Sequence, residues 1–157
     1  MLVQFKDTKF TYTKHDVENV FNTENFVYKN PIANSLGSAR DYFIAQSDGK
    51  FRPKFLVTDI VTLDNVMSYY GANKANGDDT RPTQMIKEGI AKADANFDFS
   101  QCDNDGDGEV EFVYCIYAGY SESYGADENT VWPHQWQLSA QAGTVTVDGV
   151  KCDTYAC

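Results

Sequence analysis

The sequence VEFVYCIYA, at residues 110–118, decides the fold class of this chain. Every residue after Glu111 in this stretch is apolar or aromatic, so both of its alternating faces are hydrophobic. A short run of this kind, bounded by polar residues, is typical of a strand inside a sheet that is covered on both faces. The stretch therefore predicts the central strand of a sheet.

Helical and extended patterns lie on both sides of this strand. Helices are expected at residues 16–21, at residues 39–45 with Ser38 as N-cap, and at residues 82–95 with Pro82 in the first turn and an apolar stripe. Strands are expected at residues 2–5, 51–62, 130–138 and 144–147, with Pro53 placing part of the second at a sheet edge. Helices and strands do not alternate strictly, so the order predicts an α+β or α/β fold with a mixed central sheet and packed helices.

The composition excludes several classes of protein. The chain has 157 residues, of which 42% are hydrophobic and 14% aromatic, enough apolar surface for the core of one domain. Its 13 Lys and Arg against 23 Asp and Glu give a formal charge of −10, which repels the phosphate backbone of a nucleic acid. No run of 18 apolar residues occurs, so no membrane span is expected.

The four cysteines leave two alternatives open. They are Cys102, Cys115, Cys152 and Cys157, and four cysteines permit three disulfide pairings. No C-x-x-C spacing occurs, which disfavours a zinc ribbon. Free thiols and disulfides are therefore equal alternatives at this point.

An acidic loop, residues 103–111 (DNDGDGEVE), lies directly before the central strand. Its D-x-D-x-D-G spacing puts oxygen ligands at alternate positions, and Gly108 permits the sharp turn that brings them onto one cation. The predicted calcium ligands are Asp103, Asp105, Asp107, Glu109 through its backbone carbonyl, and Glu111. Calcium suits this loop better than magnesium because it accepts six to eight ligands in loose geometry.

The acidic loop departs from a complete EF-hand at two points. Position 12 is Tyr114 instead of the bidentate Glu, and the following segment is predicted as a strand instead of a helix. We therefore expect a structural calcium site that fastens the loop to the strand. The alternative is a solvated acidic turn without an ion.

Four segments of the chain carry a further pattern: residues 37–51 (GSARDYF and SDGKF), residues 69–73 (YYGAN), residues 97–120 with the acidic loop, and residues 129–136 (NTVWPHQW). Together these segments resemble the immune-inhibitor-A-like zinc metallopeptidases. The resemblance runs from near residue 2 to Cys157 and keeps the order of the family's segments. It implies a zincin-like N-terminal subdomain of a secreted peptidase whose partners are peptide or protein substrates.

The resemblance also implies zinc-assisted peptide hydrolysis, for which the family uses an H-E-x-x-H motif on a helix. That motif is missing from this chain, whose two histidines are His15 and His134. In the family the zinc helix follows shortly after the segment matched by residues 148–157. We therefore expect residues 1–157 to form the N-terminal part of a catalytic domain, with the zinc-binding part beyond it, no catalytic residue of its own and no turnover alone.

His134 and Trp132 are the candidate substrate-binding residues, because the resemblance places their segment near the cleft. The alternative for His134 is a structural role, in which it packs and hydrogen-bonds beside two tryptophans. No serine nucleophile is assigned, and Cys115 lies in an apolar strand where inert packing is the usual role.

A second function is kept as the alternative, a non-catalytic calcium-dependent surface module. In it, exposed aromatic side chains bind peptide or glycan: Tyr120, Tyr124, Trp132 and Trp136. An H-E-x-x-H motif downstream of Cys157 favours the peptidase, and a natural stop codon there favours the module. The N-terminus shows no signal-peptide pattern. A secreted or cell-surface location is therefore expected only from the resemblance and from the need for calcium.

Overall fold

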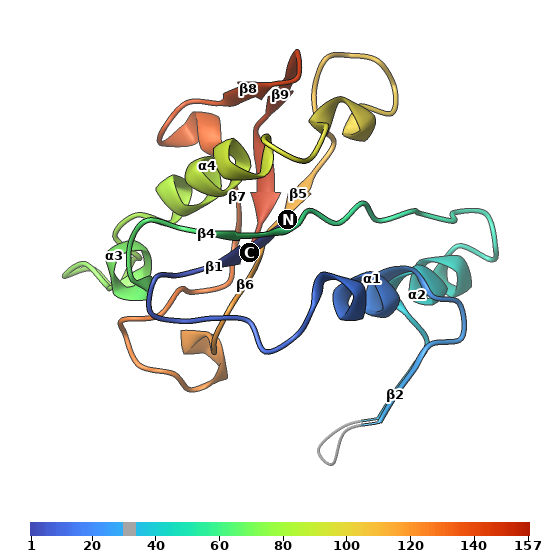
Figure 1. Ribbon diagram of the computed structural model, residues 1–157, viewed down its shortest axis with the longest axis horizontal. Helices are drawn as coiled ribbons and strands as arrows, with labels where there is room; N and C mark the ends of the chain where they lie inside the picture. Colours follow the sequence, from blue (N-terminus) through green and yellow to red (C-terminus); the bar gives the residue numbers. More distant parts are fainter. Residues whose placement is uncertain (30–33) are drawn as a thin grey trace. The chain divides into compact units, whose positions relative to one another are not determined.

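The computed structural model describes residues 1–29 and 34–157. It divides into two compact units: unit 1 consists of Met1–Thr11 and Thr58–Cys157, and unit 2 consists of Tyr12–Val57. Helices occur together with mixed sheets, so the expected α+β class is confirmed (Figure 1). No helix in these two ranges is both long and apolar enough to cross a membrane.

The main sheet of unit 1 has two three-stranded parts, in the orders β4-β1-β6 and β5-β10-β7. The strands are β1 (Leu2–Gln4), β4 (Ile60–Thr62), β5 (Val113–Tyr114), β6 (Ile116–Tyr117), β7 (Gln135–Gln137) and β10 (Thr154–Ala156). β1 runs parallel to β4 and β6. β10 runs parallel to β5 and antiparallel to β7, so the sheet is mixed as expected.

Residues 113–117 join the two parts of the sheet, and only Cys115 separates β5 from β6. The Cys115 N–H donates to the Ala156 carbonyl (2.7 Å), and the Ile116 N–H donates to the Met1 carbonyl (2.9 Å). Consecutive N–H groups of an extended strand point to opposite sides, so β10 lies on one side of this segment and β1 on the other. A central strand is confirmed at residues 113–117, shorter than the predicted stretch at residues 110–118, and Figure 1 shows β5 and β6 in line.

Helix α4 (Pro82–Ala93) packs on this sheet in unit 1. Pro82 occupies the first turn, where its missing N–H costs no hydrogen bond, and Met85, Ile86 and Ile90 are buried as the stripe predicted. Gly89 allows a close approach to β1, because a Cβ there would lie 2.9 Å from the Val3 Cγ1 atom. The helix therefore covers the N-terminal strand.

Shorter elements complete unit 1. They are α3 (Met67–Gly71), the 3-10 helices η1 (Phe99–Cys102), η2 (Glu122–Tyr124) and η3 (Leu138–Ala140), and the hairpin strands β8 (Val145–Val147) and β9 (Val150–Cys152). Asp148 and Gly149 turn the hairpin with φ of 52° and 81°, the left-handed conformation of a tight two-residue turn. The predicted strand at residues 144–147 and its turn are thus confirmed.

Two predicted strands are longer than those observed. Of residues 51–62 only β4 forms a strand, and within unit 2 the Phe55 backbone instead bonds to the Asn22 side chain, at 2.8 and 3.0 Å. Of residues 130–138 only β7 is a strand, because Pro133 has no N–H and the Trp132 N–H bonds to a side chain. Hydrophobic alternation correctly placed a strand in each segment but made both strands too long, since side chains bond to the backbone of Phe55 and Trp132.

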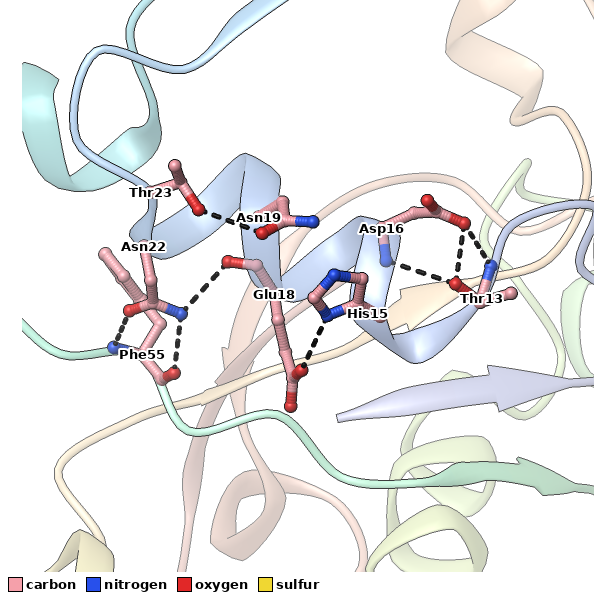
Figure 2. Close-up of polar contacts among 8 residues, drawn as sticks. All are labelled: Thr13, His15, Asp16, Glu18, Asn19, Asn22, Thr23 and Phe55. Atoms are coloured by element: carbon pink, nitrogen blue, oxygen red, sulfur yellow. Dashed lines mark hydrogen bonds and ion pairs between the residues drawn. The ribbon is translucent and has the colours of Figure 1, made fainter.

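Unit 2 contains two helices and a hairpin. They are α1 (Lys14–Asn22), β2 (Val27–Lys29), β3 (Asn34–Leu36) and α2 (Ala39–Gln46), and the two helices pack against each other. Each helix begins with a capping box, in which the N-cap hydroxyl and the carboxylate three residues later bond reciprocally to the backbone. Figure 2 shows this pair for Thr13 and Asp16, and Ser38 is confirmed as the N-cap of α2.

Residues 37–51, the first segment of the resemblance, have structural contacts within unit 2. The Asp41 carboxylate accepts from the N–H groups of Ser38 (2.8 Å) and Asn25 (2.7 Å). The Phe43 and Phe51 rings meet edge to face at 5.6 Å, and the Ser47 hydroxyl accepts from the Phe51 N–H. This segment therefore stabilises unit 2 through its caps and aromatic contacts.

Candidate functional site

The acidic loop, residues 103–111, connects η1 to β5 in unit 1. Gly106 and Gly108 have φ of 77° and 84°, the left-handed conformation that glycine adopts without steric strain. The Asp103 carboxylate accepts from the N–H groups of both glycines, at 2.8 and 3.0 Å. The loop is thereby wrapped around the Asp103 side chain, and Gly108 lies in the sharp turn that the sequence assigned to it.

Three carboxylates converge in the acidic loop. Asp103, Asp105 and Glu111 each place an oxygen within 4.8 Å of the others. The Glu111 carboxylate also accepts from the Asn104 N–H (2.8 Å). This hydrogen bond joins the end of the loop to its start. Three like charges at this spacing repel one another unless a cation lies between them, and carboxylate oxygens are the ligands that calcium prefers. These residues therefore fit a calcium ion.

The other two predicted ligands are placed differently. The Asp107 carboxylate accepts from the Glu109 N–H at 2.8 Å, and the Glu109 carboxylate forms an ion pair with Lys151. Neither side chain belongs to the converging group. For Glu109 this agrees with a ligand that uses its backbone carbonyl, whereas the predicted side-chain ligand Asp107 lies outside the group.

A neighbouring hairpin holds the acidic loop in place. The Val110 N–H donates to the Lys151 carbonyl (2.9 Å), and the Lys151 N–H donates to the Gly108 carbonyl (2.8 Å). Lys151 belongs to β9, and the Val110 side chain is buried in the core. The loop is thus fastened to β9 at the point where the chain turns into the central strand.

The described residues do not fit a catalytic zinc ion. His15 belongs to unit 2 and His134 to unit 1. The ring nitrogens of His134 already have partners: Nδ1 lies 2.7 Å from the Trp132 carbonyl, and Nε2 lies 2.8 Å from the Tyr155 hydroxyl. Over residues 1–29 and 34–157, the acidic loop is the one group of three or more His, Cys, Asp or Glu side chains with converging ligand atoms. No reaction step through zinc follows from these residues.

His134 and Trp132, the predicted substrate-binding residues, lie side by side just before β7. The Trp132 N–H donates to the Asp79 carboxylate (3.0 Å), while its side chain is half exposed. The half-buried His134 ring meets the Tyr155 ring edge to face at 5.4 Å. These contacts are those of the structural alternative for His134, and substrate binding by both residues stays a prediction.

A cavity of about 300 Å³ opens beside this segment. Its walls come from the central strand, the loop that follows it and the chain around β7: Tyr114, Cys115, Ile116, Tyr117, Gly119, Tyr120, Ser121, Tyr124, Pro133 and Cys157. The Cys157 Sγ atom lies 3.5 Å from the His134 Nδ1 atom, so the cavity borders on His134. Tyr120 and Tyr124 stack at its rim with 6.3 Å between ring centroids, and both are largely exposed, as expected.

The cysteines at this cavity are neutral thiols at pH 7. Burial raises the pKa of Cys115 to about 12 and that of Cys157 to about 11. Since the thiolate is the nucleophile, neither side chain is suited to nucleophilic attack. All four cysteines have free thiols in the structure, so of the two alternatives it shows the one without disulfides.

Asp79 contacts the segment of Trp132 and His134, and the sequence did not single it out as a candidate residue. It is 6% exposed, and it bonds to Trp132 across 53 residues of sequence. Burial raises the pKa of its carboxyl, although the hydrogen bond from the Trp132 N–H opposes that rise. Its loop, residues 73–79, has the polar, glycine-containing composition of a solvated turn, and no local pattern marks one of its carboxylates as buried.

The chain is similar to known peptidases over nearly its whole length. A family model described as the catalytic domain of immune inhibitor A peptidase M6 matches residues 4–155. Immune inhibitor A of Bacillus thuringiensis subsp. alesti is 26% identical over 120 residues, which cover 63% of this chain and 18% of that protein. The chain therefore spans less than a fifth of the length of this curated relative.

Proposed function

The chain belongs to the immune inhibitor A peptidase M6 family, and we propose that it is the calcium-stabilised N-terminal portion of a secreted zinc metalloendopeptidase. The family match supports a domain related to metallopeptidases, with peptides or proteins as substrates. The observation that carries the calcium assignment is the convergence of Asp103, Asp105 and Glu111 within 4.8 Å.

Calcium in the acidic loop would act on stability. The ion neutralises three carboxylates at the start of the central strand, and binding to the folded loop alone favours the folded state. At a calcium concentration 100 times the dissociation constant, this linkage contributes about 2.7 kcal/mol. The proposed secreted location is compatible with such a site, because extracellular calcium sites with dissociation constants of about 0.1 to 1 mM are common.

In this proposal zinc is bound by residues of the longer protein that lie outside residues 1–157. The support is that the sequence has no H-E-x-x-H motif and that the His134 nitrogens are bonded to protein atoms. This chain would supply the sheet and one wall of the substrate cleft, formed by the cavity together with Trp132 and His134. Peptide-bond hydrolysis is the proposed reaction of the whole protein.

Thermal unfolding of residues 1–157 tests the calcium assignment. We expect EDTA to lower the Tm and added calcium to restore it. Asp105→Ala should lower the Tm in calcium and remove the response to EDTA, because it deletes one of the three converging carboxylates. Asp107→Ala is the matched control, since that side chain lies outside the converging group, and it should keep the response to EDTA. An unmodified chain with the same Tm in calcium and in EDTA would refute the assignment.

Metal content and peptide hydrolysis test the zinc assignment. We expect residues 1–157 to bind no stoichiometric zinc and to release no product from an unstructured protein substrate such as casein. The complete natural protein should bind zinc and release product from the same substrate. Stoichiometric zinc in residues 1–157 would contradict the proposal, because it would require a site formed by His134 or the cysteines.

A further inference from the structure

Two buried oxygen atoms in unit 1 have no hydrogen-bond partner, the Asn73 Oδ1 and the Asp79 Oδ1. Both residues lie in the loop after α3, where they face each other as an isolated antiparallel pair. Leaving a buried acceptor unsatisfied costs about 1–3 kcal/mol, and more when the group is charged. Two such atoms in one backbone pair therefore require an explanation, for which an ordered water and an ion are the two candidates.

A third oxygen-bearing side chain meets this pair from η2. The Glu122 carboxylate accepts from the Asn73 Nδ2 atom at 3.1 Å. Its negative charge is also close enough to Asp79 to raise the pKa of that carboxyl, in addition to the larger effect of burial. The Glu122 carboxylate thus contacts the Asn73 amide and lies close enough to the Asp79 carboxyl to act on it electrostatically.

Three protein donors around this cluster bond to atoms other than the two unsatisfied oxygens. The Trp132 N–H is bonded to the second Asp79 oxygen, Oδ2, and the Asn73 amide N–H is used by Glu122. The Arg81 guanidinium donates to the Tyr69 carbonyl (3.0 Å) and lies over the Tyr69 ring at 4.4 Å. The two unsatisfied oxygens are therefore left for a group that does not belong to these side chains.

We propose that Asn73, Asp79 and Glu122 bind a divalent cation of the calcium type, at a second site separate from the acidic loop. Carboxylate and amide oxygens are ligands of hard cations, and water molecules complete the coordination. A cation satisfies both buried oxygens and also neutralises the two carboxylates. A water molecule satisfies the oxygens but leaves the two negative charges in place.

This second site connects three parts of unit 1 that are distant in sequence. Asn73 and Asp79 come from the loop after α3, and Glu122 comes from η2 beside the cavity. Through its Oδ2 atom Asp79 also holds the backbone of Trp132. Cation binding therefore orders the segment that carries Trp132 and His134, whether or not the acidic loop binds calcium.

The test uses a chain in which the acidic loop is disabled by Asp103→Asn and Asp105→Asn. Isothermal titration with calcium, and terbium emission excited through the tryptophans, should show one remaining equivalent of bound ion. Adding Glu122→Gln should weaken this binding at least tenfold. Glu128→Gln is the matched control: it removes the same charge from an exposed residue of the same segment and should leave the affinity unchanged.

Circular dichroism establishes that each variant is folded, and Glu122→Gln is preferred to Asp79→Asn because Glu122 is not fully buried. A folded loop-disabled chain that binds no ion at millimolar calcium would overturn the proposal and indicate an ordered water. Equal weakening by Glu122→Gln and Glu128→Gln would also overturn it, since that result reflects the general charge of the surface.

Discussion

The acidic loop and the segment at residues 129–134 both lie in unit 1, but contacts of very different range build them. In the loop, Asp103 bonds to Gly106 and Gly108, three and five residues away. In the segment, Trp132 bonds to Asp79 across 53 residues, and His134 bonds to Tyr155 across 21. The turn of the loop around Asp103 is therefore shaped by its own sequence, although β9 holds the end of the loop, whereas the segment is shaped by the assembly of the sheet around it.

This difference predicts how each region responds to change. Closing a loop of a few residues costs little chain entropy, so local hydrogen bonds form without help from distant parts. The segment at residues 129–134 keeps its geometry only while α3, β10 and the loop at residues 73–79 remain in place. Substitutions in its distant partners should lower the free energy of unfolding strongly, and substitutions in locally capped helices should lower it only slightly.

The largest effect is expected for Gly71→Ala, which breaks the long-range packing. A Cβ at this position would lie 2.6 Å from the Thr130 carbonyl carbon and oxygen and 2.7 Å from the Val131 nitrogen, all of them backbone atoms. Because backbone must move, we expect the free energy of unfolding to fall by about 3 kcal/mol, measured by urea denaturation.

Gly77→Ala is the control for Gly71→Ala. Gly77 has a φ of 88°, but a Cβ there meets nothing within 4 Å. Its cost should be the conformational strain alone, about 1–2 kcal/mol. If the two substitutions cost the same, the close approach of α3 to residues 130–131 does not matter for stability.

A smaller effect is expected for Tyr155→Phe, which tests the hydrogen bond to His134 without changing the packing of the ring. The Tyr155 side chain is 1% exposed, and its hydroxyl bonds to the His134 Nε2 atom at 2.8 Å. Loss of this bond should lower the free energy of unfolding by about 1 kcal/mol in chemical denaturation. Tyr124→Phe, on an exposed ring, should change it by less than about 0.5 kcal/mol. A neutral Tyr155→Phe would mean that His134 is held by its other contacts.

The smallest effect is expected at a locally capped helix, through Asp16 of unit 2. Hydrogen bonds from the hydroxyl and the N–H of Thr13 hold the pKa of Asp16 below its usual value (Figure 2). A carboxyl whose pKa is lower in the folded state stabilises the protein above its unfolded pKa, near 4, and this contribution disappears as the pH falls through the folded pKa.

Denaturation of the unmodified chain and of Asp16→Asn, compared between about pH 2 and about pH 6, measures this contribution. The two chains should differ at the higher pH and converge at the lower one. A difference that is the same at both pH values would show that the charge of Asp16 is not what stabilises the cap.

Local patterns predicted a substantial part of the fold. The apolar stripe of α4, the Ser38 cap and the Asp148–Gly149 turn are all confirmed, because each depends on residues within one or two turns of chain. The central strand was predicted as one continuous element, yet at Cys115 its hydrogen bonds pass from β10 to β1. That break depends on which strands lie beside it, and periodicity carries no information about neighbours.

The errors have a common physical origin. The strand predicted at residues 130–138 is short because the Asp79 carboxylate takes the Trp132 N–H, and the one predicted at residues 51–62 is short because Asn22 takes both backbone groups of Phe55. In each case a polar side chain, distant in sequence, replaces a ladder partner. Hydrophobic alternation predicts an extended chain but does not show where its hydrogen bonds go.

By itself the sequence determined the turn of the acidic loop and the helix caps, since their hydrogen bonds span only a few residues, and it determined the hydrophobic character of the central strand but not the strands beside it. Only the tertiary structure decided that Asp79 is buried and bonds to the Trp132 N–H, that Asn73 bonds to Glu122, and that His134 bonds to Tyr155. These pairs lie 53, 49 and 21 residues apart. They form because the packing of the sheet and α3 offsets the conformational entropy that is lost when such long loops close. No local pattern in the sequence indicates this packing.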